Sequence, residues 1–83
     1  MVILFPVSSS MIAAAGYDSK NRILIVLYNT GRAYEYLNVP PEEFQELMKA
    51  DSKGKYMNTR ILNVYPYAFF KGWKDLGDSS EDQ

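Results

Sequence analysis

The chain has 83 residues, a formal net charge of −1, and neither cysteine nor histidine. This length accommodates one domain. The missing residue types exclude disulfides, zinc fingers, thiol nucleophiles and histidine acid–base catalysis, because each of these needs a thiolate or an imidazole. Small secreted domains usually carry disulfides, so we expect a cytoplasmic protein, or one that self-association stabilises.

Charge is unevenly distributed along the sequence. Residues 75–83 hold four acids and no base, whereas residues 49–74 hold six bases and one acid. The acidic segment also contains Gly77 and two serines, a composition typical of disorder. We therefore expect a single domain over residues 1–74 with a basic surface, followed by a disordered acidic tail over residues 75–83.

The chain begins with an apolar run, Met1–Val7. A signal peptide would need a basic start and a longer apolar stretch, and Pro6 interrupts this one. The run is also far shorter than the roughly 20 apolar residues of a membrane span. We interpret it as an edge strand or an arm, and we expect no membrane association.

Three strands are predicted next. Met11–Tyr17 is a run of small apolar residues, and Arg22–Tyr28 is almost wholly aliphatic, β-branched or aromatic. Asp18–Asn21 and Asn29–Gly31 have the composition of hairpin turns. With Arg32–Leu37 as the last strand, the pattern predicts a three-stranded antiparallel meander.

A helix is predicted after Pro40. Proline is tolerated in the first helical turn, and the acids that follow Pro41 complement the helix dipole. Phe44, Leu47 and Met48 fall at the i, i+3, i+4 spacing of one apolar face. This helix is expected to end near residue 50, packed on the sheet.

A second helix is predicted from Lys53 to about Leu62, with residue 51 or 52 as its cap and residues 57 and 61 buried. Gly54 in its first turn costs about 1 kcal/mol of helix stability relative to alanine. A close approach of the backbone to a neighbour or to a ligand would explain this glycine. Together the elements predict an α+β fold.

Two features favour self-association. The strand Arg22–Tyr28 is apolar on both faces, whereas two short helices cover only one face of a sheet. The other face needs the N-terminal arm, the C-terminal segment or another chain. The segment Tyr65–Trp73 holds five aromatics in nine residues. It is either a strand or arm folded onto the same core, or an intersubunit contact made by Phe69, Phe70 and Trp73.

Taken in order, these motifs resemble the KTSC domain, a segment named from the C-terminus of some lysyl-tRNA synthetases and found as small standalone proteins of bacteria and phages. The resemblance covers residues 7–67, and its hallmark Tyr-x-Tyr is met by Tyr34 and Tyr36. Met57 departs from the aromatic residue that is more common there. The resemblance implies a non-catalytic domain with a suggested role in RNA binding. The residues that carry it are Val7–Ile12, Gly16–Asp18, Gly31, Tyr34–Tyr36, Val39–Pro40, Ala50–Asn58, Ile61 and Tyr65–Tyr67.

Tyr34 and Tyr36 are the first candidate site. They alternate on one strand and therefore project from the same face. They would form a platform on which bases stack, worth about 1–3 kcal/mol per base, and Tyr17 is a further candidate member. The alternative is that they are core or cross-strand residues, which we favour for at least one of them.

The second candidate site lies at the start of the second helix. Backbone N–H groups at a helix N-terminus, opened by glycine and flanked by lysine, form an anion site, and asparagine and arginine add hydrogen bonds to phosphate or a base edge. The serines at positions 8 to 10 are placed to join it. The alternative is an ordinary solvated face. The candidates are Ser8, Ser9, Lys53, Gly54, Lys55, Asn58 and Arg60.

Catalysis is not expected. Asp18, Glu35 and Asp51 are isolated, and the sequence has no metal-ligand cluster or phosphate-binding loop motif. We therefore expect no cofactor. The predicted function is a non-catalytic module for a nucleotide-type ligand, either single-stranded RNA or a small signalling nucleotide. The alternative is a protein-interaction or assembly module, forming homo-oligomers or binding a host or tRNA-related protein.

Overall fold

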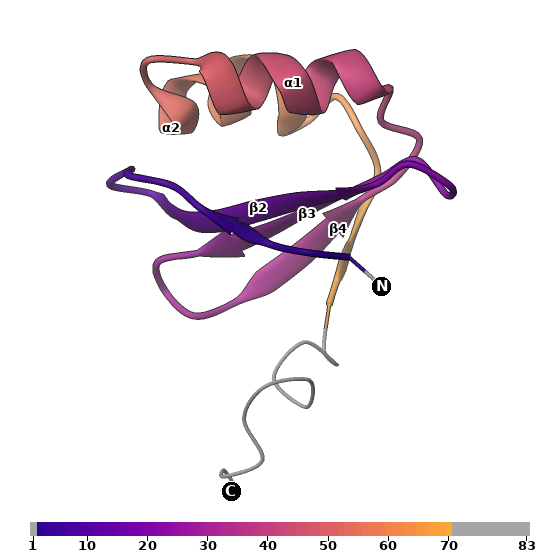
Figure 1. Cartoon of the computed structure of the whole chain (residues 1–83), viewed down its shortest axis with the longest axis horizontal. Helices are drawn as coiled ribbons and strands as arrows, with labels where there is room; N and C mark the ends of the chain where they lie inside the picture. Colours follow the sequence, from indigo (N-terminus) through magenta and orange to yellow (C-terminus); the bar gives the residue numbers. More distant parts are fainter. Residues whose placement is uncertain (1, 71–83) are drawn as a thin grey trace, which may run out of the picture.

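The computed structural model describes residues 2–70, and in them a five-stranded antiparallel sheet lies beneath the helices (Figure 1). The strands follow one another in space as they do in sequence. The prediction of a three-stranded sheet is wrong. The apolar N-terminal run adds one edge strand, as one of its two interpretations predicted, and the aromatic segment adds the other. The strands are β1 (Phe5–Pro6), β2 (Ile12–Asp18), β3 (Ile23–Tyr28), β4 (Ala33–Tyr36) and β5 (Tyr67–Phe69).

The first predicted turn forms because Asp18 organises it. Its carboxylate accepts hydrogen bonds from the backbone N–H groups of Lys20 and Asn21 and from the side chain of Asn21. In the second turn Gly31 has a φ of 95°, which a residue without a Cβ adopts without strain. Both turns confirm the predicted meander of β2, β3 and β4.

The first helix, α1 (Pro41–Lys49), begins and ends as predicted, and Leu47 on its apolar face is fully buried. The second helix covers the predicted residues but changes type along its length. It starts as α2 (Lys53–Tyr56), capped by the Ser52 hydroxyl, and continues as a π-helical turn, η1 (Met57–Ile61). The Leu62 N–H closes that wider turn on the Met57 carbonyl at 2.8 Å.

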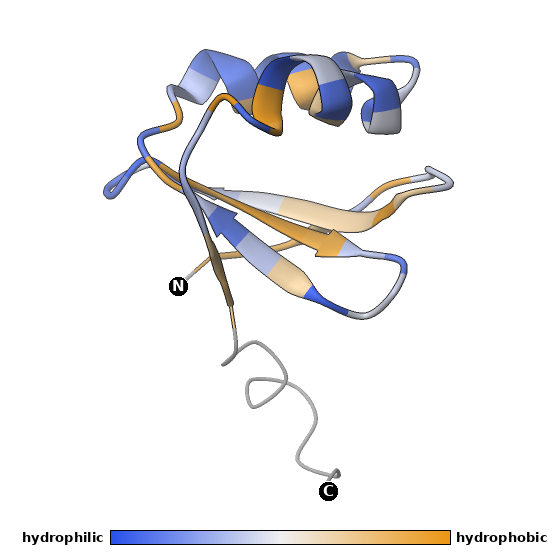
Figure 2. Cartoon of the chain, turned by 180° about the vertical axis from the view of Figure 1, so that it is seen from behind, coloured by the Kyte–Doolittle hydropathy of each residue, from blue (hydrophilic) through white to orange (hydrophobic). Residues whose placement is uncertain are grey.

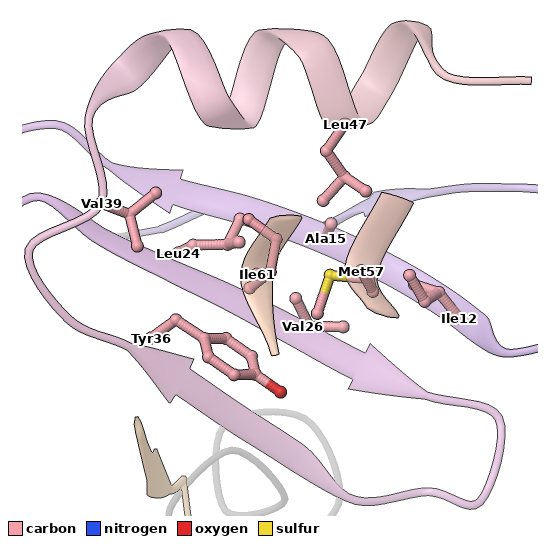
Figure 3. Close-up of a cluster of buried hydrophobic side chains, with 9 residues drawn as sticks. All are labelled: Ile12, Ala15, Leu24, Val26, Tyr36, Val39, Leu47, Met57 and Ile61. Carbon is pink, nitrogen blue, oxygen red and sulfur yellow. The ribbon is translucent and has the colours of Figure 1, made fainter. Parts of the chain in front are cut away.

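The core lies between the sheet and the helices (Figure 3). The predicted buried pair of the second helix, Met57 and Ile61, is fully buried in it. The hydropathy colouring in Figure 2 follows the same division: the central strand β3 is apolar, and the helices are largely hydrophilic on their outer surface. The buried cluster consists of Ile12, Ala15, Leu24, Val26, Tyr36, Val39, Leu47, Met57 and Ile61.

The N-terminal arm crosses the face of the sheet opposite the helices (Figure 1). There it contacts Gly16: a Cβ at that position would lie 2.5 Å from the Ile3 carbonyl oxygen and 2.8 Å from Leu4 Cδ2. On this face Ile25 is 5% exposed and Ala33 is fully buried. The arm, one of the three covers considered for the second apolar face, therefore lies on it.

Candidate functional site

An open groove lies between the C-terminal end of the second helix and strands β4 and β5. Its cavity volume is about 430 Å³, within the range of small-molecule sites. Four of its lining residues are tyrosines and none is charged, so we call it the tyrosine groove. It is lined by Met11, Tyr28, Tyr34, Tyr36, Leu62, Asn63 and Tyr67.

Strand pairing brings the tyrosines together. Tyr34 and Tyr36 alternate on β4, and β5 sets Tyr67 directly opposite Tyr36. The ring of Tyr67 lies 5.7 Å from that of Tyr34 and 6.1 Å from that of Tyr36, centroid to centroid. Tyr34 also contacts Tyr28 in an edge-on arrangement at 5.9 Å. The four rings therefore form one contiguous aromatic surface.

Exposure changes across this surface. Tyr36 is 2% exposed and belongs to the core, while Tyr67 is 65% exposed at the rim. Tyr28 and Tyr34 are intermediate. The expectation that at least one residue of the Tyr34–Tyr36 pair is a core residue therefore holds for Tyr36. The groove has a buried aromatic floor and an open aromatic rim.

The hydroxyls of Tyr28 and Tyr36 are hydrogen-bonded to each other at 2.5 Å. Burial raises the pKa of Tyr28, and it raises the pKa of Tyr36 further. Both phenols are therefore neutral at physiological pH and each keeps its hydrogen.

Tyr17 lies elsewhere. Its ring stacks on Phe44 of α1 at 5.6 Å, and its hydroxyl donates a hydrogen bond to the Val39 carbonyl. Both contacts tie β2 to the start of the helical layer. Tyr17 is not among the groove residues, so the structure does not bring it to the Tyr34–Tyr36 pair.

The predicted anion-site side chains are largely engaged within the fold. The Lys53 ammonium donates to the Ala50 carbonyl at 3.0 Å. Arg60 pairs with Glu43 at 3.5 Å and lies over the ring of Tyr56. These contacts direct two of the predicted phosphate ligands to α1 and its connection to α2.

Lys55 and Asn58 are exposed on the second helix. The backbone N–H of Lys55 bonds to the Ser52 hydroxyl, which occupies the helix N-terminus that was predicted to bind an anion. Gly54 makes the close approach that its position suggested, and the neighbour is Met11: a Cβ on Gly54 would lie 3.3 Å from the Met11 sulfur. Because Met11 lines the groove, the start of α2 lies beside that end of it.

Of the predicted serines, Ser9 has a structural role. Its hydroxyl accepts hydrogen bonds from the backbone N–H groups of Met11 and Ile12 and so shapes the entry into β2. Ser8 is exposed. Because its hydroxyl bonds to the Met11 N–H, Ser9 lies toward the same end of the groove as Gly54.

Three features of the groove were not anticipated. Tyr28 ends β3 and follows Leu24 and Val26 at every second residue, so the sequence predicts that the three side chains point to the same face of the sheet. Tyr67 joins the site only through the register in which β5 pairs with β4, and no local pattern predicted that register. Asn63 has a φ of 68°, just after the helix end, a conformation that asparagine tolerates and that often follows a helix.

Glu43 organises a second polar cluster, outside the groove. The hydroxyls of Tyr56 and Tyr65 both donate to its carboxylate, and its side chain is only 11% exposed. Burial and the hydrogen bond to Glu43 raise the pKa of Tyr56 to about 12. This cluster joins α1, α2 and the segment that leads to β5.

Residues 2–70 contain no group of three or more acidic side chains placed to hold a metal ion. Within the same range, no helix is both long and apolar enough to cross a membrane. Of the predicted interface residues, Phe69 is 49% exposed and Phe70 is partly buried. Trp73 and the predicted acidic tail lie outside the described residues.

Residues 8–65 match the model of one protein family, the KTSC domain. A protein of Tsukamurella paurometabola is 47% identical over 53 residues, which cover 64% of this chain and 79% of the relative. A lysine–tRNA ligase of Nostoc punctiforme is 33% identical over 69 residues, which cover 80% of this chain but only 12% of the enzyme.

The fold is also similar to a solved structure. The crystal structure of a KTSC domain protein from Yersinia pestis superposes with a TM-score of 0.81 at 35% sequence identity. The match covers 83% of this chain and 97% of that protein. A small protein of nearly the same extent therefore has the same fold.

Proposed function

The chain belongs to the KTSC domain family, and we propose that it is a non-catalytic cytoplasmic module that binds a ligand carrying a nucleobase. The observation that carries this proposal is the tyrosine groove, where four phenol rings meet in a cavity of about 430 Å³. Each base has a π-face, and stacking on aromatic rings contributes about 1–3 kcal/mol per base. The two sources of such a ligand are a small signalling nucleotide and single-stranded RNA.

The groove favours recognition of the base over recognition of the phosphate. None of the lining side chains is charged, and two predicted phosphate ligands, Lys53 and Arg60, have partners within the fold. Affinity for a small nucleotide should therefore come from stacking and change little with salt. RNA would add contacts at Lys55, which is exposed near the Met11 end of the groove. Salt dependence would then separate the two ligands.

One relative supports the RNA form of the ligand. The segment of the Nostoc punctiforme protein that matches this chain belongs to an enzyme named for tRNA. A domain of this family attached to such an enzyme would lie close to RNA. The same relative also supports a tRNA-related protein as a partner.

The proposal is tested with a thermal-shift panel of mono-, di- and cyclic nucleotides and short single-stranded RNAs. A ligand at 100 times its dissociation constant adds roughly 2.7 kcal/mol of stability, a shift of about 10–20 °C in a domain of this size. Tyr67→Ala should reduce the shift at little cost to folding, because Tyr67 is 65% exposed. Val64→Ala is the matched control, since Val64 is 58% exposed and is not a groove residue. A panel without any shift would overturn the proposal.

A protein-interaction or assembly module is the second candidate. Val64, Tyr67 and Phe69 expose 49–65% of their surface near the edge strand β5, which pairs in the described residues with β4 alone. Exposed apolar side chains beside an open sheet edge favour strand addition. This function predicts that Phe69→Ala or Trp73→Ala lowers the oligomeric mass in sedimentation and leaves nucleotide binding unchanged.

A further inference from the structure

The paired hydroxyls on the floor of the tyrosine groove leave one hydrogen unused. Two neutral phenols, Tyr28 and Tyr36, carry two hydroxyl hydrogens, and the single bond between their oxygens uses one of them. Whichever phenol donates, the other keeps a hydrogen. Within residues 2–70 neither hydroxyl makes another hydrogen bond. Burial raises the pKa of both phenols, so neither loses its hydrogen by ionisation at neutral pH.

This unused hydrogen lies at the groove, where an acceptor atom of a ligand can bond to it. Tyr36 is 2% exposed, and both phenols line the groove. A hydroxyl hydrogen that lines the groove and has no acceptor among the described residues is free to bond to a ligand. The groove is the side from which an acceptor reaches the pair, because both rings line it and Tyr36 lies at the edge of the core cluster (Figure 3).

We propose that the Tyr28–Tyr36 hydroxyl pair is the polar recognition point of the groove and donates one hydrogen bond to an acceptor atom on the ring edge of the bound ligand. This rests on the proposed function, because it assumes that a planar ring occupies the groove. The rings of Tyr34 and Tyr67 contact the ligand's face or edge, and the hydroxyl pair identifies the acceptor.

The pair thereby defines a chemical class of ligand. A heterocycle with an unprotonated ring nitrogen or a ring carbonyl oxygen satisfies the free hydrogen, as every nucleobase does. A phenylalanine ring or an indole offers stacking but no ring acceptor. The groove should therefore prefer a nucleobase over an aromatic side chain. This preference distinguishes a nucleobase site from a pocket that binds an aromatic residue of another protein.

A pair of probes isolates the hydrogen bond. Benzimidazole has the size and shape of indole but carries one unprotonated ring nitrogen. Both are titrated into the full ¹⁵N-labelled chain, and dissociation constants are taken from amide shifts. We expect benzimidazole to bind about fivefold more tightly than indole, the effect of one neutral hydrogen bond. Equal affinity would overturn the inference, and this comparison requires no variant.

The variant that tests the assignment is Tyr28→Phe/Tyr36→Phe. It removes both hydroxyls together, and replacing both partners of a hydrogen bond by apolar groups of the same shape is close to neutral for stability. In this variant the benzimidazole preference should vanish. Tyr17→Phe is the control, because the Tyr17 hydroxyl bonds to Val39 outside the groove, and there the preference should persist. A preference that survives in the double variant would overturn the inference.

Titration of adenosine and uridine in the same experiment separates two kinds of failure. If nucleosides bind and the two probes bind equally or not at all, the hydroxyl pair is not the recognition point and the proposed function stands. If nucleosides and probes alike leave every amide unshifted, the inference and the nucleotide-binding function fail together.

Discussion

The carbonyl oxygen of Ile3 lies against Gly16 so closely that a Cβ at Gly16 would be 2.5 Å from it. The contact places the N-terminal arm on the face of the sheet that the helices leave open (Figure 1). Gly16 is thus required for a close approach of two backbone segments. This close approach of the N-terminal arm explains how an 83-residue chain covers part of both faces of its sheet.

Gly16→Ala should displace the arm, because the added carbon meets the backbone oxygen of Ile3 at 2.5 Å in addition to the side chain of Leu4. We expect a loss of about 1–3 kcal/mol in the free energy of unfolding, the usual cost of overpacking, measured by urea denaturation. Gly54→Ala is the matched control. Its new Cβ meets the flexible Met11 side chain at 3.3 Å, so its effect should stay within about 1 kcal/mol. Equal effects of the two substitutions would contradict the role of the arm.

The hydroxyl pair predicts non-additive stabilities. Tyr28→Phe or Tyr36→Phe alone leaves the other hydroxyl without its partner at 2.5 Å and should cost about 1 kcal/mol. The double variant should be more stable than the sum of the two losses predicts. Thermal unfolding of the unchanged protein, the two single variants and the double variant gives the coupling free energy between the two hydroxyls. Strict additivity would indicate that the bond between the two oxygens does not contribute to stability.

Replacing Glu43 should lower the free energy of unfolding more than replacing its neighbour Glu42. Glu43→Ala leaves the hydroxyls of Tyr56 and Tyr65 without their acceptor, and we expect a loss of about 1–3 kcal/mol. Glu42→Ala removes an exposed acid from the same helical turn and so controls for the helix dipole, worth about 0.3–1 kcal/mol. Chemical denaturation of both variants compares them, and similar losses would rule out a special role for the Glu43 cluster.

The fold should lose stability at alkaline pH. The pKa of Tyr56 rises from 10.0 to about 12 in the folded chain, so ionisation favours the unfolded state. The stabilisation is complete below pH 10 and disappears as the pH rises toward 12. Burial raises the pKa of Tyr17, Tyr28, Tyr36 and Tyr65 in the same direction. The phenolate absorbance of these five tyrosines should appear together with unfolding, and unfolding midpoints independent of pH between 10 and 12 would contradict these shifts.

Groove binding should depend on ring stacking more than on salt. Tyr34→Ala removes the ring that contacts both Tyr28 and Tyr67, and nucleotide affinity should fall roughly 5- to 150-fold, the equivalent of about 1–3 kcal/mol. Lys55→Ala should change mononucleotide affinity little and weaken RNA binding, reducing its salt dependence. Fluorescence titrations at two salt concentrations measure both effects. A mononucleotide affinity that falls with Lys55→Ala and not with Tyr34→Ala would point to a phosphate site instead.

The sequence alone determined the elements with strong local signals. The aliphatic and β-branched run of β3, the carboxylate of Asp18 in its turn and the proline start of α1 each depend on neighbours within a few residues. The i, i+4 pair Met57 and Ile61 fixed the buried side of the second helix for the same reason. Local periodicity and turn chemistry are sufficient where side-chain direction follows from backbone geometry.

The tertiary structure decided what depends on distant pairing. β5 has three residues and no pattern that distinguishes a strand from an arm, so only its register with β4 brings Tyr67 to Tyr36. The same holds for the phosphate hypothesis: Arg60 and Lys53 are apt anion ligands by type, but contacts with Glu43 and Ala50 engage them within the fold. Spacing fixes the direction of a side chain, whereas its partner is fixed only when segments far apart in sequence pack together.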